Sequence, residues 1–388
     1  MTRTTGSFRV LNVGGEEVRS FQPRPLPPAE PPLVLDERLL ALHNAALAAV
    51  GRLAVAGVMV PSPNWFLYGF VRKEAVISSQ IEGTQATLKD VLTYEATHDA
   101  DRLDDVREVC NYVDALAFAR REIARPKGLP LSVRLLCAAH NRLMRGARGA
   151  EKQPGAIRTS QNWIGGTRPG NASFVPPPPD ALPQELSELE RWLYADDPLP
   201  PLVRAGLAHV QFETIHPFLD GNGRIGRLLI VLLLEHWGLL QSPLLYLSLA
   251  FKRHREEYYR CLSAVRAAGD WEGWTAYFLE CVREAADDGI ATATSLFALL
   301  NKDRQRLLRM RDATIPAVRL WDALPGRPIV TLSGAMSLLK TTKPTAAKAV
   351  ATLCRANILR ETTGRRRDRV YAYHAYLDVL TKDTDALP

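Results

Sequence analysis

Apolar residues recur at spacings of three and four along most of this chain, which is the period of an amphipathic α-helix. The pattern is clear in 36–54 (DERLLALHNAALAAVGRLA) and in 132–146 (SVRLLCAAHNRLMRG). A continuous apolar run at 228–234, LLIVLLL, predicts a buried central helix that ends near Gly238, because glycine commonly terminates helices. That run is far too short to span a bilayer. The pattern therefore predicts a mainly α-helical protein.

Two segments depart from the helical period. In 161–179, QNWIGGTRPGNASFVPPPP, two β-prone runs flank a glycine pair and a turn, which is typical of a β-hairpin; an irregular loop is the alternative. From about residue 313, helical runs at AVRLW, SGAMSLLK and PTAAKAVATLCRAN precede two β-prone runs, ILRE and VYAY. Helices followed by a hairpin are the layout of a winged helix-turn-helix. Proline-rich segments, QPRPLPPAEPPL, FVPPPPDALP and ALPGRPIV, predict linkers or loops.

The composition is that of a globular protein. With 388 residues, 46% of them hydrophobic and 23% charged, the chain is long enough for two or three domains. The formal net charge of +7 favours an anionic partner but equally suits a basic surface, so it decides little. Five scattered cysteines without a C-x-x-C pair predict neither a disulfide framework nor a zinc site. Because the N-terminal residues also lack the apolar core of a signal peptide, we expect a cytoplasmic protein.

The segment 216–227, HPFLDGNGRIGR, concentrates candidate chemistry in front of the long apolar run. Gly221 and Gly223 permit a tight turn that delivers backbone N–H groups to a helix N-terminus, which is a phosphate-binding arrangement. Arg224 and Arg227 are three residues apart, so they share one face of the first helical turn. Their guanidinium groups could bind successive phosphates of a triphosphate.

Two further residues of this segment complete a candidate active site. Asp220 precedes the turn and is a candidate ligand for a hard divalent cation, Mg²⁺, that would bridge the same phosphates. His216 can act as a general base on an incoming hydroxyl. Each residue alone also has an ordinary structural explanation, and it is their combination within one short segment that favours a catalytic site. The residues by themselves do not choose between adenylylation and other phosphoryl or nucleotidyl transfers.

The segment resembles, without a mismatch, the HxFx[D/E]GNGRxxR signature of the Fic family. The resemblance implies transfer of AMP from ATP to a serine, threonine or tyrosine hydroxyl of a target protein, with release of pyrophosphate and with Mg²⁺ as cofactor. It implies that His216 deprotonates the hydroxyl, Phe218 anchors the loop and Asp220 binds Mg²⁺. It further implies an anion cradle and contacts to the β- and γ-phosphates made by Gly221, Asn222, Gly223, Arg224 and Arg227.

The resemblance extends well beyond this loop. The segments PGAIRTSQNWIGG and FVPPPP resemble the Fic flap, a hairpin that aligns the target peptide by strand addition. The segments EEYYRCL and DWEGWTAYFL resemble the helices behind the adenine, with Tyr258 and Tyr259 as base contacts. The implied fold class is mainly α: a Fic helical bundle with a small β-hairpin flap, plus a C-terminal winged helix-turn-helix. We expect an N-terminal helical region over 1–125, the Fic catalytic core and a helical extension over 126–310, and the winged helix over 311–388.

An upstream motif, Ser78-x-x-x-Glu82-Gly83, matches the [S/T]xxxE[G/N] inhibitory motif of Fic proteins. An ordinary helix end at Glu82-Gly83 would look the same. The resemblance implies that Glu82 reaches the nucleotide site, pairs with Arg227 and keeps the isolated enzyme slow. It also allows a second reaction, in which Glu82 positions a water molecule to remove AMP from a modified target.

A second class of function stays open, that of a nucleotide-sensing regulator that binds DNA through the winged helix. Basic residues of the expected recognition helix and wing are candidates for phosphate contacts: Lys343, Lys348, Arg355, Arg365, Arg366, Arg367 and Arg369. A solvated hairpin looks similar, winged helices often bind proteins, and an intact His216 favours the enzyme. The expected partners are ATP, a target protein and the chain itself through self-modification. DNA and a second copy of the chain are left open, and no membrane partner is expected.

Overall fold

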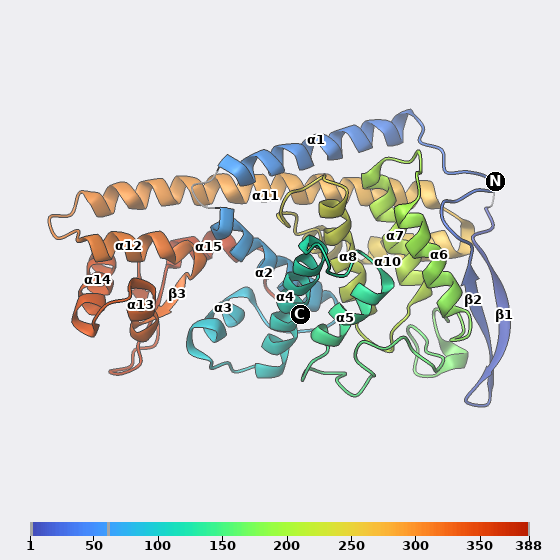
Figure 1. Ribbon diagram of the computed structural model, residues 1–388, viewed down its shortest axis with the longest axis horizontal. Helices are drawn as coiled ribbons and strands as arrows, with labels where there is room; N and C mark the ends of the chain where they lie inside the picture. The colour runs from blue at the N-terminus through green and yellow to red at the C-terminus, as the bar shows by residue number, and fades with distance from the viewer. Residues whose placement is uncertain (1–2, 60–62, 387–388) are drawn as a thin grey trace. The chain divides into compact units, whose positions relative to one another are not determined.

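The computed structural model describes residues 3–59 and 63–386, and α-helices account for most of them (Figure 1). The prediction of a mainly α-helical chain is confirmed. The described residues form two compact units. The first contains those up to Gly51 with Asn111–Pro243 and Leu247–Ala285, and the second contains Arg52–Cys110, Leu244–Tyr246 and those from Ala286 onward.

Three helices contribute residues to both units: α1 (Glu37–Met59), α4 (Leu103–Ala124) and the 38-residue helix α11 (Trp271–Leu308). The predicted helix at 36–54 is confirmed by α1. The division into three domains stays a prediction.

The centre of the first unit is the pair formed by α7 (Pro201–Ile215) and α8 (Asn222–His236). Nearly every residue of both helices is buried, which confirms the predicted central helix. The two helices approach closely at Gly226, where a Cβ atom would lie 2.3 Å from Oε1 of Glu213. A larger residue would therefore displace the Glu213 side chain and crowd the His209 ring. After α8, Gly238 has a φ of +71°, as expected for a helix-terminating glycine.

The remaining helices of the first unit are shorter. They are α5 (Val133–Leu143), α6 (Leu182–Tyr194), α9 (Ser248–Arg253), α10 (Arg255–Ala268) and the 3₁₀ turn Pro169–Asn171. The predicted helix at 132–146 is confirmed by α5, whose N-cap Ser132 accepts a hydrogen bond from the Leu135 N–H. The beginning of α11 is tied to α7, because the Trp274 indole donates to the Gly206 carbonyl at 3.0 Å.

An N-terminal hairpin of β1 (Gly6–Val13) and β2 (Glu16–Pro23) was not predicted. The turn between the strands consists of Gly14 and Gly15, both with positive φ, which is the chemistry of a two-residue hairpin turn. The glycine pair between two β-prone runs was therefore a readable signal.

The segment expected to form the flap hairpin is more irregular than the sequence predicted. Among the described residues of 161–179, a single antiparallel bridge joins Ile164 to Phe174, and the predicted hairpin is reduced to that bridge. The run of four prolines at 176–179 explains the difference, because proline supplies no N–H group to a ladder. The Phe21 N–H of β2 donates to the Val175 carbonyl at 2.9 Å, so the N-terminal hairpin lies beside this segment.

The second unit begins its own helical part with α2 (Pro63–Ile81) and α3 (Leu88–Thr97). A reciprocal capping box between Thr87 and Asp90 starts α3. An ion pair of 2.7 Å between Arg72 and Glu95 connects the two helices.

The C-terminal residues of the second unit alternate helices and short strands. In chain order they are α12 (Ile315–Ala323), the 3₁₀ turn Leu324–Gly326, β3 (Ile329–Thr331), α13 (Leu332–Leu339), α14 (Lys343–Arg355), β4 (Arg360–Glu361), β5 (Val370–Ala372) and α15 (His374–Leu380). The strands form an antiparallel sheet in the order β3-β5-β4. Pro344 lies in the first turn of α14, as predicted. The assignment as a winged helix-turn-helix stays a prediction.

One helix has the length and composition that crossing a membrane requires. The segment Glu37–Gly57 of α1 has a mean hydropathy of 1.6, and 28% of its most apolar part is buried. Core helices of soluble proteins and N-terminal signal sequences meet the same criterion, so the observation is weak evidence for a membrane span.

Candidate active site

The loop between α7 and α8 brings most of the predicted site residues together. His216 caps the C-terminus of α7 in the left-handed conformation, with φ +50° and ψ +61°. Gly221 is the N-cap of α8 and is also left-handed, with φ +78°. The chain thus turns from one buried helix into the next within the segment that carries His216, Asp220 and the glycines. A non-glycine residue in the left-handed region costs free energy, so the surrounding contacts must hold His216 there.

The Asn222 side chain closes this loop. The Phe218 N–H donates to Oδ1 of Asn222 at 2.9 Å, and Nδ2 of Asn222 donates to the Phe218 carbonyl at 2.8 Å. Asn222 is 2% exposed, so both bonds are shielded from water. The sequence predicted Asn222 only as part of an anion cradle, and this structural task of its side chain was missed.

His140 of α5 supports the same loop from the other side, and it too was missed. Its ring is stacked on that of Phe218, with the ring centroids 3.9 Å apart. The Gly155 N–H donates to Nδ1 of His140, so Nε2 carries the proton and donates to the Asp220 carbonyl at 2.9 Å. Burial lowers the pKa of His140 to about 4, which keeps the ring neutral near pH 7 and preserves this tautomer. An isolated histidine in a helical pattern gives no sequence signal for such a task.

The predicted phosphate-binding residues lie in the first two turns of α8. The N–H groups of a first helical turn have no acceptor within the helix, and the helix dipole makes this end positive. Arg224 and Arg227 are each 2% exposed. Nη2 of Arg224 lies 3.6 Å from Oδ1 of Asp220. Backbone donors and two guanidinium groups thus meet at one helix end, which is an arrangement that suits phosphates.

Asp220 offers a single carboxylate beside that helix end. Its side chain is 41% exposed, and its Oδ1 accepts from the Gly221 N–H at 2.6 Å. The described residues contain no group of three His, Cys, Asp or Glu side chains that could hold a metal ion. Mg²⁺ commonly takes one or two carboxylates and completes its shell with water and substrate phosphates. The donor set therefore fits a Mg²⁺ ion that arrives with a nucleotide.

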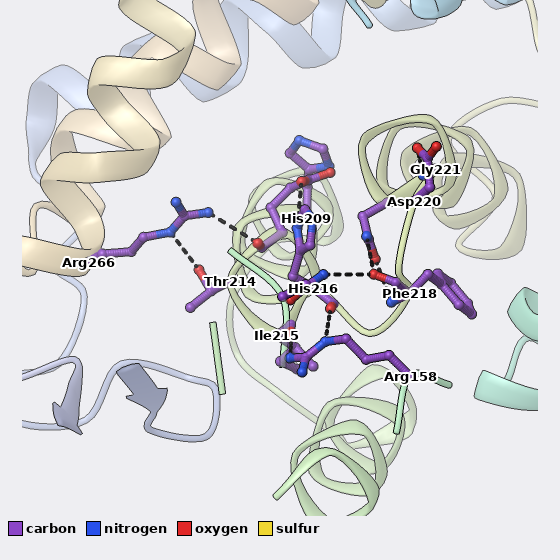
Figure 2. A network of polar contacts seen from close by, with 12 residues as sticks. Arg158, His209, Thr214, Ile215, His216, Phe218, Asp220, Gly221 and Arg266 are labelled. Atoms are coloured by element: carbon purple, nitrogen blue, oxygen red, sulfur yellow. Dashed lines mark hydrogen bonds and ion pairs between the residues drawn. The ribbon is translucent and has the colours of Figure 1, made fainter. Parts of the chain in front are cut away.

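His216 is the one candidate base in the loop, and its side chain is 18% exposed. Its Nδ1 lies 4.0 Å from Oε2 of Glu213, which is itself 6% exposed. The His216 carbonyl accepts a hydrogen bond of 2.9 Å from Nε of Arg158 (Figure 2). Neither Glu213 nor Arg158 was singled out by the sequence, since a lone acidic or basic residue near a motif carries no distinctive pattern.

The two tyrosines predicted to contact the base have different surroundings. Tyr258 is 2% exposed, its hydroxyl is 2.8 Å from Nε2 of His209, and its ring is stacked on Phe251. Tyr259 is 41% exposed. Tyr258 is therefore part of the aromatic core behind α8, whereas Tyr259 faces solvent. Their assignment as base contacts stays a prediction.

The predicted inhibitory residues belong to the second unit. Ser78 is buried in the last turns of α2, which ends at Ile81. Glu82 follows the helix and is exposed, and Gly83 adopts a φ of +97°. A helix end formed by Glu82 and Gly83 is the ordinary structural explanation of the motif, and it is compatible with an inhibitory task.

The fold and the loop define a helical protein with an anion-binding helix end next to a histidine. A model of the Fic/DOC family N-terminal region matches residues 40–121, and a model of the Fic/DOC family domain matches residues 130–234. These two segments match the Fic/DOC family, as the resemblance of the loop predicted.

Curated relatives show the same likeness. The protein adenylyltransferase Fic of Drosophila willistoni is 27% identical over 263 residues, which cover 65% of this chain and 48% of that protein. The protein of the same name from Drosophila grimshawi is 28% identical over 212 residues, covering 53% of this chain and 40% of that protein. The chain spans about half the length of the curated relatives it matches.

Solved structures agree on the fold. A Fic family protein from Desulfovibrio desulfuricans superposes with a TM-score of 0.58 at 22% identity, covering 88% of this chain and 98% of that one. A Fic domain containing signaling protein from Bacteroides thetaiotaomicron gives a TM-score of 0.50 at 18% identity, covering 66% of this chain and 97% of that one. These likenesses bear out the predicted Fic helical bundle.

Proposed function

We propose that this chain is a protein adenylyltransferase, which transfers AMP from ATP to a hydroxyl group of a target protein. The observation that carries the proposal is the loop between α7 and α8, where His216 directly precedes a helix end built for phosphates. The names of the curated relatives support adenylylation over other phosphoryl and nucleotidyl transfers. The acceptor can be serine, threonine or tyrosine, because the residues of the loop do not discriminate between these three hydroxyl side chains.

In this mechanism the oxygen of the target hydroxyl forms a bond to the α-phosphorus, and the bond from that phosphorus to the pyrophosphate oxygen breaks. His216 takes the hydroxyl proton on Nε2, since its Nδ1 is turned toward Glu213. Arg224, Arg227 and the N-terminus of α8 hold the β- and γ-phosphates and stabilise the charge that develops on pyrophosphate. Asp220 would hold a Mg²⁺ ion that neutralises part of the same charge.

The inhibitory task of Glu82 is part of the proposal. Its carboxylate would pair with Arg227 and so compete with the γ-phosphate of ATP for the same guanidinium. The Ser78-x-x-x-Glu82-Gly83 motif supports this pairing, and the position of Glu82 directly after α2 makes its side chain accessible. The same carboxylate would position water for the reverse task, removal of AMP from a modified target. All five cysteines are free, which supports a reducing compartment, and we place the reaction in the cytoplasm.

Incubation with ATP labelled at the α-phosphate, Mg²⁺ and a cell lysate tests the proposed transfer. We expect label in protein and an added AMP mass on the chain itself by intact-mass analysis, and neither with His216→Ala. ATP labelled at the γ-phosphate, tested with the purified chain and no lysate, should leave the chain unlabelled. Label from the γ-phosphate would instead identify a kinase and overturn the proposal.

DNA binding by residues 311–388 is a second candidate function. Its supporting observation is the order of α12, α13, α14 and the small sheet, together with exposed basic side chains on α14 and in the turn between β4 and β5. These exposed residues are Lys343, Lys348, Arg355, Arg365, Arg366, Arg367 and Arg369. A mobility-shift assay with random duplex across a salt series tests it. Binding that weakens steeply with salt and is lost in the combined Arg365, Arg366 and Arg367 to Ala variant supports the candidate, whereas absence of salt-dependent binding removes it.

A further inference from the structure

Two arginines, Arg158, which is buried, and Arg266, which is partly exposed, bind the end of α7, where the catalytic loop begins. Arg158 is 1% exposed, and its Nε donates to the His216 carbonyl at 2.9 Å. Its own backbone N–H donates to the Pro217 carbonyl, also at 2.9 Å. Arg266 of α10 donates from Nη2 to the Glu213 carbonyl at 3.1 Å and from Nε to the Thr214 hydroxyl at 3.2 Å (Figure 2).

These contacts answer a physical need of the loop. The last carbonyls of a helix have no partner within it, and they form the negative end of the helix dipole. A guanidinium group supplies several donors and a positive charge at that end. Because His216 is held in the left-handed conformation, the peptide that follows it must be fixed from outside the helix. Arg158 fixes that peptide through both its side chain and its backbone.

Both arginines also reach the flap segment. Nη2 of Arg158 donates to the Pro177 carbonyl at 2.5 Å, and Nη1 donates to the Ser160 carbonyl at 3.2 Å. The guanidinium of Arg266 lies over the Phe174 ring, 4.0 Å from its centroid. Each arginine therefore contacts the end of α7 on one side and the flap segment on the other.

The flap segment is in turn held by the N-terminal hairpin. The Ser20 hydroxyl donates to the Pro176 carbonyl at 2.7 Å, next to the bond between Phe21 and Val175. The flap carbonyls on both sides of Arg158 thus belong to a fixed piece of backbone. A change at the flap would therefore reach the His216 peptide through the single side chain of Arg158.

We propose that Arg158 and Arg266 are positioning residues that couple the flap to the catalytic histidine. They touch neither ATP nor the target hydroxyl. Arg158 sets the His216 peptide and hence the direction of its ring, and Arg266 fixes the preceding turn of α7. Binding of a target peptide at the flap then changes the position of the His216 ring through these two side chains. The functional part of this inference rests on the proposed adenylyltransferase activity.

A purely structural capping task is the alternative, and Arg204 provides the matched control. Arg204 is also buried, at 7% exposed, and its Nη2 donates to the carbonyls of Trp192, Leu193 and Ala195 at the end of α6. It caps a helix of the same unit with the same chemistry and has no contact with the catalytic loop in any of these bonds. Arg158→Gln and Arg204→Gln should therefore lower the melting temperature by similar amounts.

The test compares Arg158→Gln, Arg158→Lys, Arg266→Gln and Arg204→Gln in the full chain. Hydrogen exchange of the peptide over 212–222 and the Cε1–H NMR signal of His216 are read without ATP or target, the signal being assigned by its loss in His216→Ala. We expect faster exchange and a shifted His216 signal in Arg158→Gln and in Arg266→Gln, with neither change in Arg204→Gln. We further expect kcat to fall about 10- to 100-fold in Arg158→Gln with the Kd for ATP within about twofold of wild type.

The outcomes separate the coupling from the proposed activity. Equal losses of kcat in Arg158→Gln and Arg204→Gln, or an unshifted His216 signal in a folded Arg158 variant, would overturn the positioning task. If Arg158→Gln does not fold, Arg158→Lys carries the same test, because a lysine keeps the charge but cannot bind the His216, Ser160 and Pro177 carbonyls together. A specific shift of the His216 signal in a chain that labels no protein would contradict the adenylyltransferase activity and leave the structural connection intact.

Discussion

The side chain of Asn222 and the backbone of Phe218 exchange two hydrogen bonds, one of 2.9 Å to the Phe218 N–H and one of 2.8 Å to its carbonyl. This pair sets the width of the loop that separates His216 from the N-terminus of α8. Since an amide is the one side chain that offers a donor and an acceptor side by side, neither aspartate nor leucine can replace it at this position.

We therefore expect Asn222→Asp to damage the loop. The new oxygen would face the Phe218 carbonyl, and the lost donor would cost about 1–3 kcal/mol of unfolding free energy. Denaturant unfolding monitors the stability, and adenylylation with saturating ATP monitors the loop. An unchanged variant in both measurements would show that the loop keeps its shape without this pair.

Replacing His216 by alanine should abolish transfer while ATP still binds. The imidazole acts on the hydroxyl and not on the phosphates, and a positioned general base contributes about 10²- to 10⁴-fold in rate. Calorimetry measures ATP binding and intact mass measures transfer. A folded variant with full activity would rule out the base, and simultaneous loss of ATP binding would indicate a structural histidine.

Asp220→Ala should remove the part of turnover that depends on Mg²⁺, because the ion neutralises charge on the leaving pyrophosphate. Asp220→Asn is the matched variant, since its amide oxygen keeps an acceptor for the Gly221 N–H and removes the carboxylate charge. Titration of Mg²⁺ at fixed ATP measures the effect. Identical titration curves for wild type and both variants would show that Asp220 is not the ligand.

The sequence predicted the parts of the site that are local in the chain. His216, Asp220, the glycines and the two arginines of α8 lie within one segment, and its spacing predicted that the glycines and arginines lie at a helix N-terminus. The supports of the loop come from distant segments: His140 from α5, Arg158 from the chain between α5 and the flap segment, and Arg266 from α10. Each is a single polar residue whose role depends on tertiary contacts. Neither the hydrophobic periodicity nor a sequence motif therefore predicts that role.

The same reasoning explains the two misjudged β segments. The Gly14-Gly15 turn was a local signal and was readable in principle. The flap segment has the composition of a hairpin, yet its proline run withholds the donors that a ladder needs. Composition therefore overestimated one hairpin, while another went unnoticed.

Glu185 predicts a measurable pH dependence of stability. Burial, with a smaller contribution from the nearby Glu188 carboxylate, raises its pKa to about 8, and the Arg158 guanidinium opposes both effects. Between the ordinary pKa of 4.5 and about 8 the folded chain keeps a proton that the unfolded chain releases, so stability falls as the pH rises through this window. The contribution to the slope is at most about 1.4 kcal/mol per pH unit.

Glu185→Gln should remove that contribution, and the gain in melting temperature over wild type should grow from pH 5 to pH 8. Glu188→Gln is the control: it removes only a neighbouring charge, so it should shift the window to lower pH without abolishing it. Parallel pH profiles for wild type and Glu185→Gln would contradict a protonated Glu185.

Glu82→Gly should raise adenylylation, most visibly as self-modification. In the proposed restrained state the Glu82 carboxylate occupies the Arg227 guanidinium, and its removal lets Arg227 take the γ-phosphate and turn the α-phosphate toward His216. Because Arg227 is buried, losing the carboxylate leaves its charge uncompensated, so the variant should melt earlier unless ATP takes the place of the carboxylate. Intact-mass kinetics with ATP and Mg²⁺ measure the rate of self-modification, and thermal unfolding with and without ATP measures the ATP-induced rise in melting temperature. Both the rate and the rise should be larger than in wild type.

The double variant Glu82→Gly with Arg227→Ala separates release of the brake from a general loosening of the chain. If the freed Arg227 guanidinium causes the activation, the adenylylation rate of the double variant must fall back to the wild-type level or below, even though Glu82 is absent. Activity that persists in the double variant would mean that Glu82 restrains the enzyme by another route than Arg227. A single variant that folds, binds ATP and stays inactive would instead argue for a positive task of Glu82, such as positioning the water that removes AMP.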